Sequence, residues 1–120
     1  MSLIGKPTPL LDGGIKATGK IQYVGDMPFP GLLHARPVTS IYPHARILSI
    51  KSEAARELPG VVAVITADDL PAVTPSSRHA LLLARERALF VGHPIALVLA
   101  ESEQAALDAV GLVQVEYEPL

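Results

Sequence analysis

Histidine side chains are the groups in this sequence best suited to bind a metal or to move a proton near neutral pH. His34 and His44 lie on two strand-like runs that could pair, so their rings could approach each other. A metal site needs three or four converging ligands, and the sequence has no cysteine and no HxH or HExxH spacing. We therefore interpret both histidines as structural or interfacial residues, and His44 with Arg46 as candidates for a contact between domains.

A third histidine, His93, stands between Gly92 and Pro94. This glycine–proline punctuation predicts a tight turn, in which a lone histidine is usually exposed. We take Gly92 and Pro94 as structural candidates at that turn.

Two acidic pairs could serve as general acid and base. Asp68 and Asp69 follow Thr66, however, in a pattern that resembles a capping box with Asp in place of Glu. Glu101 and Glu103 flank Ser102, which can cap a helix, and acidic side chains in a first helical turn complement the helix dipole. Capping explains both pairs better than catalysis does.

A glycine-rich stretch around Gly13, Gly14 and Lys16 could suggest phosphate binding, but it lacks the GxxxxGK[ST] spacing and follows no buried strand. We interpret Gly13 and Gly19 as turn glycines. Ser40 and Ser49 lack the GxSxG elbow of a nucleophile. The sequence therefore predicts no catalytic, cofactor-binding or metal-binding residue in this chain.

Composition narrows the class of protein. The 120 residues are 49% hydrophobic and 18% charged, which is typical of one globular domain. A net charge of −2 argues against nucleic acid as a partner, because phosphate binding needs a basic patch. Without cysteine there are no disulfides and no iron–sulfur ligands. No apolar run reaches the roughly 20 residues that cross a bilayer, and we expect a cytoplasmic protein without membrane contact.

The pattern of apolar residues and turns predicts an α+β fold with a mixed or antiparallel sheet, one short helix and one longer helix. Residues 1–12 are expected to form an extended arm and residues 13–120 a single domain. In the strand pair within residues 31–50, Leu33 with Ala35 and Ala45 with Ile47 should each share a buried face. The remaining expected elements are a hairpin-like stretch over 13–24, a helix over 53–58, a buried strand over 61–65, a loop over 71–80, a central strand over 95–99, a helix after Ser102 with an apolar stripe from Ala105 to Val113, and a strand over 115–117.

Several separated motifs occur in order along nearly the whole chain. They are Asp12-Gly13 with Lys16-Ala17-Thr18-Gly19, Tyr23 and Asp26; Pro30-Gly31-Leu32-Leu33-His34-Ala35; Pro43-His44-Ala45-Arg46-Ile47; Pro59-Gly60-Val61 with Thr66 to Pro71; Phe90-Val91-Gly92-His93-Pro94-Ile95-Ala96; and Val115 to Leu120. Together they resemble the N-terminal α/β hammerhead domain of the molybdenum-binding large subunit of the xanthine dehydrogenase, aldehyde oxidase and carbon monoxide dehydrogenase family.

The resemblance implies a parent oxidoreductase that hydroxylates a carbon centre or oxidises an aldehyde. Molybdopterin with molybdenum would belong to the remainder of the large subunit, and iron–sulfur clusters and FAD to other domains or subunits. No position in this chain matches the family's pterin-binding segments or its glutamate base. The motif residues Gly13, Gly19, Tyr23, Asp26, His44, Arg46, Gly92 and Pro94 are then structural or interface candidates.

The sequence departs from the family pattern at three places. His93 stands where the family usually has Glu or Gln, and Ser40-Ile41-Tyr42-Pro43-His44 replaces Ser-Pro-x-Ala-His. Residues 72–89 match poorly. Two other readings stay open, a stand-alone interaction module and a carrier of the biotinyl or lipoyl kind, which would need a modifiable lysine such as Lys20 or Lys51 at a hairpin tip.

Overall fold

The computed structural model describes residues 4–71 and 82–120. The chain forms two compact units, one ending at Pro30 and the other beginning at Gly31. The division after residue 12 stays a prediction. The loop predicted over 71–80 lies, apart from its first residue, outside the described residues.

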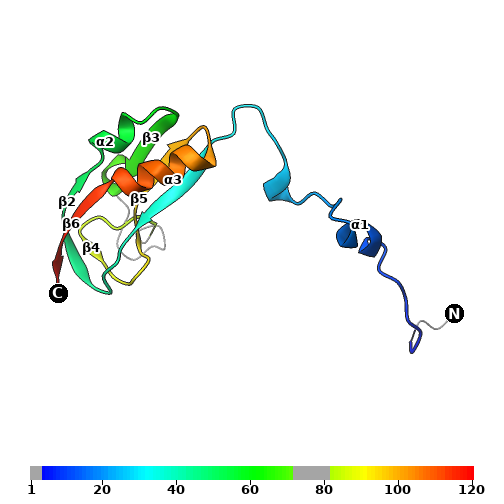
Figure 1. Cartoon of the computed structure of the whole chain (residues 1–120). Helices are drawn as coiled ribbons and strands as arrows, with labels where there is room; N and C mark the ends of the chain where they lie inside the picture. Colours follow the sequence, from blue (N-terminus) through cyan, green and yellow to red (C-terminus); the bar gives the residue numbers. More distant parts are fainter. Residues whose placement is uncertain (1–3, 72–81) are drawn as a thin grey trace. The chain divides into compact units, whose positions relative to one another are not determined.

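The first unit contains two short helical segments, α1 (Gly13–Ala17) and the 3₁₀ turn η1 (Val24–Asp26), both drawn in blue shades in Figure 1. The hairpin predicted over 13–24 was wrong. Local hydrogen bonds satisfy the backbone instead, because the Lys16 amide donates to the Asp12 carbonyl at 3.0 Å and the Thr18 amide to the Gly14 carbonyl at 3.1 Å. Gly19 follows this helix with a φ of +67°. Its left-handed backbone therefore ends a helix rather than turning a hairpin.

The described residues of the second unit form two antiparallel three-stranded sheets. One has the order β1-β5-β3 and is built from β1 (His34–Thr39), β5 (Pro94–Ala100) and β3 (Val61–Thr66). The other has the order β4-β2-β6 and is built from β4 (Arg87–Ala88), β2 (Ala45–Lys51) and β6 (Gln114–Pro119). The helices are α2 (Glu53–Arg56) and α3 (Glu103–Leu112), and a 3₁₀ turn, η2 (Ala67–Asp69), follows β3. The α+β prediction is confirmed.

The predicted pairing of β1 with β2 was wrong. β1 pairs with β5, whereas β2 pairs with β4 and β6. The connection between them is fixed elsewhere, because the Ser40 amide donates to the His93 carbonyl at 2.9 Å and the Ser40 carbonyl accepts from the Gly92 amide at 2.8 Å. These bonds take residues 40–44 from one sheet to the other, so they do not close a hairpin.

The buried face of β1 is the opposite of the predicted one. Val38 is buried and Arg36 is half-buried, while Leu33 and Ala35 are exposed. Arg36 lies on the helix side because its guanidinium pairs with Glu103 at the start of α3, while its aliphatic stem can lie along apolar surface. In β2 the prediction is confirmed, since Ala45 is buried and Ile47 half-buried on one face.

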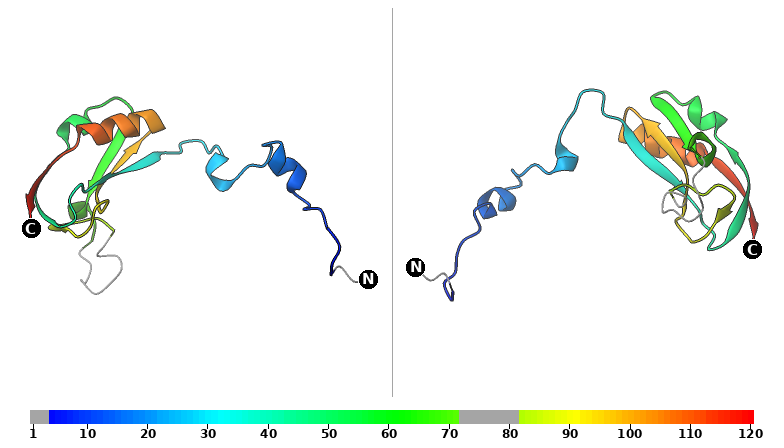
Figure 2. Two further views of the ribbon diagram at one scale, coloured as in Figure 1. Left: turned by 60° about the horizontal axis from the view of Figure 1, so that its bottom comes forward. Right: turned by 180° about the vertical axis from the view of Figure 1, so that it is seen from behind.

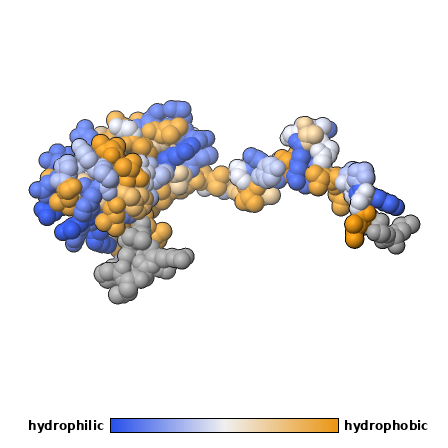
Figure 3. Space-filling view, turned by 90° about the horizontal axis from the view of Figure 1, so that it is seen from below, coloured by the Kyte–Doolittle hydropathy of each residue, from blue (hydrophilic) through white to orange (hydrophobic). Residues whose placement is uncertain are grey.

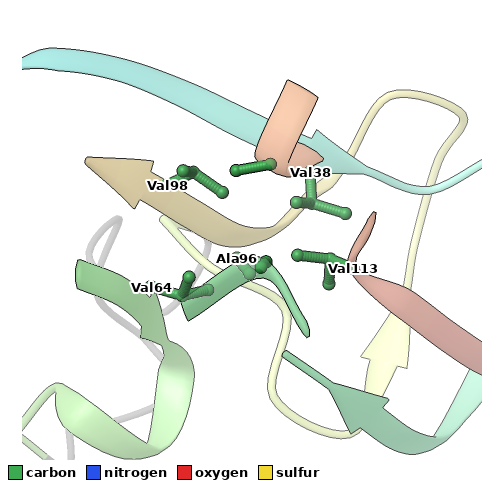
Figure 4. Close-up of a cluster of buried hydrophobic side chains, with 7 residues drawn as sticks. Val38, Val64, Ala96, Val98 and Val113 are labelled. Atoms are coloured by element: carbon green, nitrogen blue, oxygen red, sulfur yellow. The ribbon is translucent and has the colours of Figure 1, made fainter. Parts of the chain in front are cut away.

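The core lies between the β1-β5-β3 sheet and the two helices. Figure 4 shows Val38, Val64, Ala96 and Val98 of the sheet grouped with Val113 at the end of α3. The helix after Ser102 is confirmed: the Ser102 side chain accepts a hydrogen bond from the Ala105 amide at 3.2 Å. Its apolar stripe is confirmed as well, and Figure 2 (left) shows α2 and α3 on the same side of the strands.

The other predicted elements are confirmed with adjustments. β5 is the central strand of its sheet, and β6 occupies the predicted last strand. The helix predicted over 53–58 ends at Arg56, two residues before Leu58. The strand over 61–65 is an edge strand, and of its residues Val64 is buried while Val62 is 54% exposed. It is therefore half-buried rather than fully buried as predicted.

Candidate functional site

Two polar side chains are almost fully buried where the β1–β2 connection meets the turn before β5. Ser40 and His93 are each 2% exposed. The two backbone hydrogen bonds between residues 40 and 92–93 join the segments, and Tyr42 and Tyr117 lie beside them with ring centroids 5.2 Å apart in an edge-on arrangement. We call Ser40, Tyr42, His93 and Tyr117 the polar junction.

His93 is buried, so the exposed turn histidine expected from the sequence was wrong. Its Nδ1 accepts a hydrogen bond from the Leu89 amide at 3.2 Å, and its ring stacks on Phe90 with centroids 4.5 Å apart. A nitrogen that accepts an amide hydrogen carries no proton itself, so this contact leaves Nε2 as the donor atom of the ring. The turn closes with the His93 amide donating to the Phe90 carbonyl, and Gly92 has a φ of +88°.

The Ser40 hydroxyl both donates and accepts a hydrogen bond. The hydroxyl donates to the Tyr42 carbonyl at 2.9 Å and accepts from the Tyr42 amide at 3.1 Å. Its proton is thus directed at a carbonyl rather than at a base, which argues against a nucleophilic role. Burial raises the pKa of the neighbouring Tyr117 phenol above its usual value, and the Ser40 hydroxyl opposes that shift. The junction therefore favours the neutral phenol.

The histidine pair considered for metal binding is divided between the sheets. His34 begins β1 opposite Ala100, whereas His44 is exposed just before β2 and its carbonyl accepts from the Leu120 amide at 3.1 Å. Arg46 faces outward and pairs with Glu118 of the adjacent strand at 2.8 Å. His44 and Arg46 therefore lie beside the end of β6, as an exposed polar margin of that sheet.

In the first unit, Tyr23 and Asp26 are directly linked. The Asp26 carboxylate accepts from the Tyr23 amide at 3.0 Å, and the Asp26 amide donates to the Tyr23 carbonyl at 2.9 Å. The Tyr23 side chain is 60% exposed. Gly13 belongs to α1 and Gly19 follows it, so these four motif residues shape the local backbone of this unit.

In the first acidic pair, Asp69 has the capping role that the sequence predicts, whereas Asp68 forms an ion pair that the sequence analysis did not predict. The Asp69 carboxylate accepts from the Thr66 amide at 2.7 Å and from the Thr66 hydroxyl at 3.1 Å, and these bonds lower the pKa of Asp69. Asp68 pairs with Arg85 at 2.8 Å. Both carboxylates are thus engaged by separate partners, which argues against a paired-carboxylate site at these two positions.

Two observations show what the described residues offer a metal ion. Within residues 4–71 and 82–120, no group of three His, Cys, Asp or Glu side chains converges to hold a metal ion. A shallow hollow of about 300 Å³ lies at the ends of β2 and β6 and is lined by Ser49, Lys51, Gln114, Val115 and Glu116. Its lining offers a single cation and one carboxylate, too few groups to ligate a metal. Lys51 is paired across the sheet with Gln114 and is not at a hairpin tip, which argues against a carrier module.

Comparison with known proteins gives the same family as the sequence motifs. Residues 18–120 match the family model described as aldehyde oxidase and xanthine dehydrogenase, a/b hammerhead domain. The chain belongs to this family. It is 38% identical to one subunit of a probable xanthine dehydrogenase of Bacillus subtilis, over 98% of this chain and 16% of that protein. It is 43% identical to the carbon monoxide dehydrogenase large chain of Afipia carboxidovorans, over 85% of this chain and 13% of that protein.

The fold agrees with a solved member. The reconstituted CO dehydrogenase from Oligotropha carboxidovorans superposes with a TM-score of 0.85 at 39% identity, over 97% of this chain and 15% of that one. The hammerhead domain described here thus spans about a sixth or less of the length of these relatives. Across the described residues, no helix is both long and apolar enough to span a membrane.

The sequence did not reveal the polar junction. It presents Ser40 as a serine without a nucleophile motif and His93 as an exposed turn residue, yet the two segments meet through their backbones. The available signal was the aromatic residue Phe90, which stands three positions before His93 in the chain and can stack on its ring when the turn closes.

Proposed function

We propose that this hammerhead domain is a structural part of the large subunit of a molybdenum hydroxylase, an oxidoreductase of the xanthine and aldehyde dehydrogenase type, and that it has no turnover by itself. The family match over residues 18–120 is the observation that supports this most directly. The hydrogen-bonded hydroxyl of Ser40 and the lack of a converging ligand set among the described residues favour a scaffold over a catalyst.

The parent enzyme then supplies the chemistry. We place molybdopterin with molybdenum on the remainder of the large subunit, and iron–sulfur clusters and FAD on other domains or subunits, all in the cytoplasm. Oxygen derived from water would be transferred to the substrate at that centre. The relatives' names, which include a probable xanthine dehydrogenase and a carbon monoxide dehydrogenase large chain, support this assignment.

The residues that the motifs single out would shape and present this scaffold. Gly92 and Pro94 hold the turn that buries His93, and Tyr23 with Asp26 close a 3₁₀ turn in the first unit. Gly13 and Gly19 shape the short helix before it. The exposed His44 and Arg46 are the candidates for polar contacts with neighbouring domains or subunits.

The experiment is to isolate the native large subunit and to measure its molybdenum by plasma mass spectrometry, beside the 120-residue chain purified alone. We expect about one molybdenum per large subunit and none bound by the isolated chain, which should nevertheless melt cooperatively. Stoichiometric, tight molybdopterin binding by the isolated chain would refute the scaffold role. A native large subunit that lacks molybdenum would refute the proposal that this domain is part of a molybdenum enzyme.

A further inference from the structure

The face of the β1-β5-β3 sheet that points away from the helices is apolar apart from Thr39 at the end of β1, and Ile95 at its β5 end is already fully buried. Alternation along each strand places on it the residues between those that contact α2 and α3. Six of them form two rows across the three strands. They are Ala35 and Pro37 of β1, Leu97 and Leu99 of β5, and Ala63 and Ile65 of β3. We call these six residues the open sheet face.

The strand register places these side chains in one continuous patch. Leu97 lies opposite Pro37 on one side and Ile65 on the other, and Leu99 lies between Ala35 and Ala63. Ala35 and Pro37 are exposed, and the other four are half-buried. Figure 3 views this unit from below, along the sheet, and shows hydrophobic side chains near its middle with hydrophilic ones along its outer edge.

Such a pattern is unusual for a sheet with one face in water. An antiparallel sheet of that kind alternates apolar and polar residues, whereas β5 is apolar on both faces from Pro94 to Ala100. The helices account for one face only, because α2 and α3 pack against the side bearing Val38, Val64 and Val98. The sequence analysis predicted Leu33 and Ala35 to be buried because both are apolar, and in the structure they lie on the side that the helices do not cover.

The two edges of the sheet, in contrast, offer few free backbone groups for a further strand. At β3 the Arg56 guanidinium donates to the Val64 carbonyl at 2.9 Å, and the Asp69 carboxylate accepts from the Thr66 amide at 2.7 Å. At the opposite edge, β1 contains Pro37, which has no amide hydrogen to offer. These features discourage pairing with an added strand. A partner would therefore contact the face and not extend the sheet.

We infer that the open sheet face is covered in the parent enzyme by an apolar surface of the remaining polypeptide of the same large subunit. This inference rests on the proposed function. The relatives extend far beyond the matched region, which is 16% and 13% of their lengths, so most of each chain is outside it. None of the six side chains is charged or can donate a hydrogen bond, so a complementary surface must itself be apolar. Exposed apolar patches on soluble proteins mark such contacts.

Side-chain footprinting tests this directly. The isolated 120-residue chain and the complete large subunit are labelled with a photoactivated carbene, and cleavage after Glu101 and Glu103 separates Leu97 and Leu99 from Leu107. We expect labelling of Leu97 and Leu99 to fall at least about fivefold in the subunit. Labelling of Leu107, which is 47% exposed on α3, provides the reference within the same sample.

A pair of variants supplies the second measurement. Ala35→Glu places a carboxylate on the open sheet face, and Leu107→Glu places one on the exposed side of α3. Both should leave the melting temperature of the isolated chain nearly unchanged. In the complete subunit we expect Ala35→Glu to increase the rate of limited proteolysis about tenfold and Leu107→Glu to have little effect, because only the first buries an unpaired charge.

The outcomes separate the inference from the proposed function. Equal labelling of Leu97 and Leu99 in the chain and the subunit, or equal proteolysis of the two variants, overturns the inference. The inference is also overturned if Leu97 and Leu99 are already protected in the isolated chain and the chain sediments as a dimer, because a second copy would then cover the open sheet face. The molybdenum content of the same subunit preparation reports on the proposed function independently of the footprint.

Discussion

Replacing Val98 with alanine measures how much the helix-covered face of the sheet stabilises this domain. Val98 is 0% exposed and lies opposite both Arg36 of β1 and Val64 of β3, so it occupies the centre of the core. The change removes two buried methyl groups, which costs about 1.6 kcal/mol in transfer free energy. Incomplete collapse around the cavity adds to this, and the total should be about 2–3 kcal/mol.

That loss is large relative to the roughly 5–15 kcal/mol stability of a small domain. Urea unfolding followed by circular dichroism should show a lower midpoint with an unchanged slope. The melting temperature should fall by about 10–20 °C, since a domain of this size loses about 4–8 °C per kcal/mol. The matched control is Val62→Ala, which removes the same two methyl groups from a side chain that is 54% exposed.

The control should cost less than about 1 kcal/mol, a cost due to strand propensity rather than to a cavity. Equal destabilisation by the two variants would mean that Val98 is not more buried than Val62, and the placement of α3 over this face would then be wrong. A change in the slope of the Val98→Ala transition would instead show that the substitution alters the unfolded ensemble.

Two further substitutions test the helix and the 3₁₀ turn. Ala109→Asp buries a carboxylate at a position of α3 that is 0% exposed. The free energy of unfolding should therefore fall by several kcal/mol, and cooperative melting should be lost or shifted to a lower temperature. An unchanged melting transition would contradict the helix register. The pKa of Asp69 is lowered from 3.8 by its bonds to Thr66, so its contribution to stability is present above that pH and is lost as the pH falls below it. In Asp69→Asn this part of the acid dependence should disappear from unfolding curves measured between about pH 2 and 5, and an acid dependence equal to that of the wild type would show that the contact with Thr66 does not form.

Elements determined by neighbouring residues were predictable from the sequence. The Ser102 cap and the apolar stripe through Ala106 and Ala109 predict α3 from residues within the helix itself, and the structure has both. The Asp69 turn depends on residues three positions apart, and β5 is an uninterrupted apolar run. In each case the relevant contacts lie within or next to the pattern that predicts them.

Features that depend on distant residues were not predictable in this way. The sheet partner of β1 lies about 60 positions away, and its register is set by Val38 opposite Ala96. Two adjacent strand-like runs with a five-residue connection match a hairpin equally well in sequence. The choice is made by the backbone bonds of Ser40 to residues 92 and 93, which no local pattern contains.

The buried position of His93 limits which side chains could take its place. The position must offer an acceptor to the Leu89 amide at a site with almost no water, and an imidazole Nδ1 does so here at 3.2 Å. A Glu or Gln at this position would also present a side-chain acceptor, whereas an apolar residue would leave the amide unsatisfied. The shared requirement is therefore a hydrogen-bond acceptor that holds the turn before β5. That requirement concerns the path of the backbone, because the turn places Pro94 at the start of the central strand and joins the two sheets through Ser40.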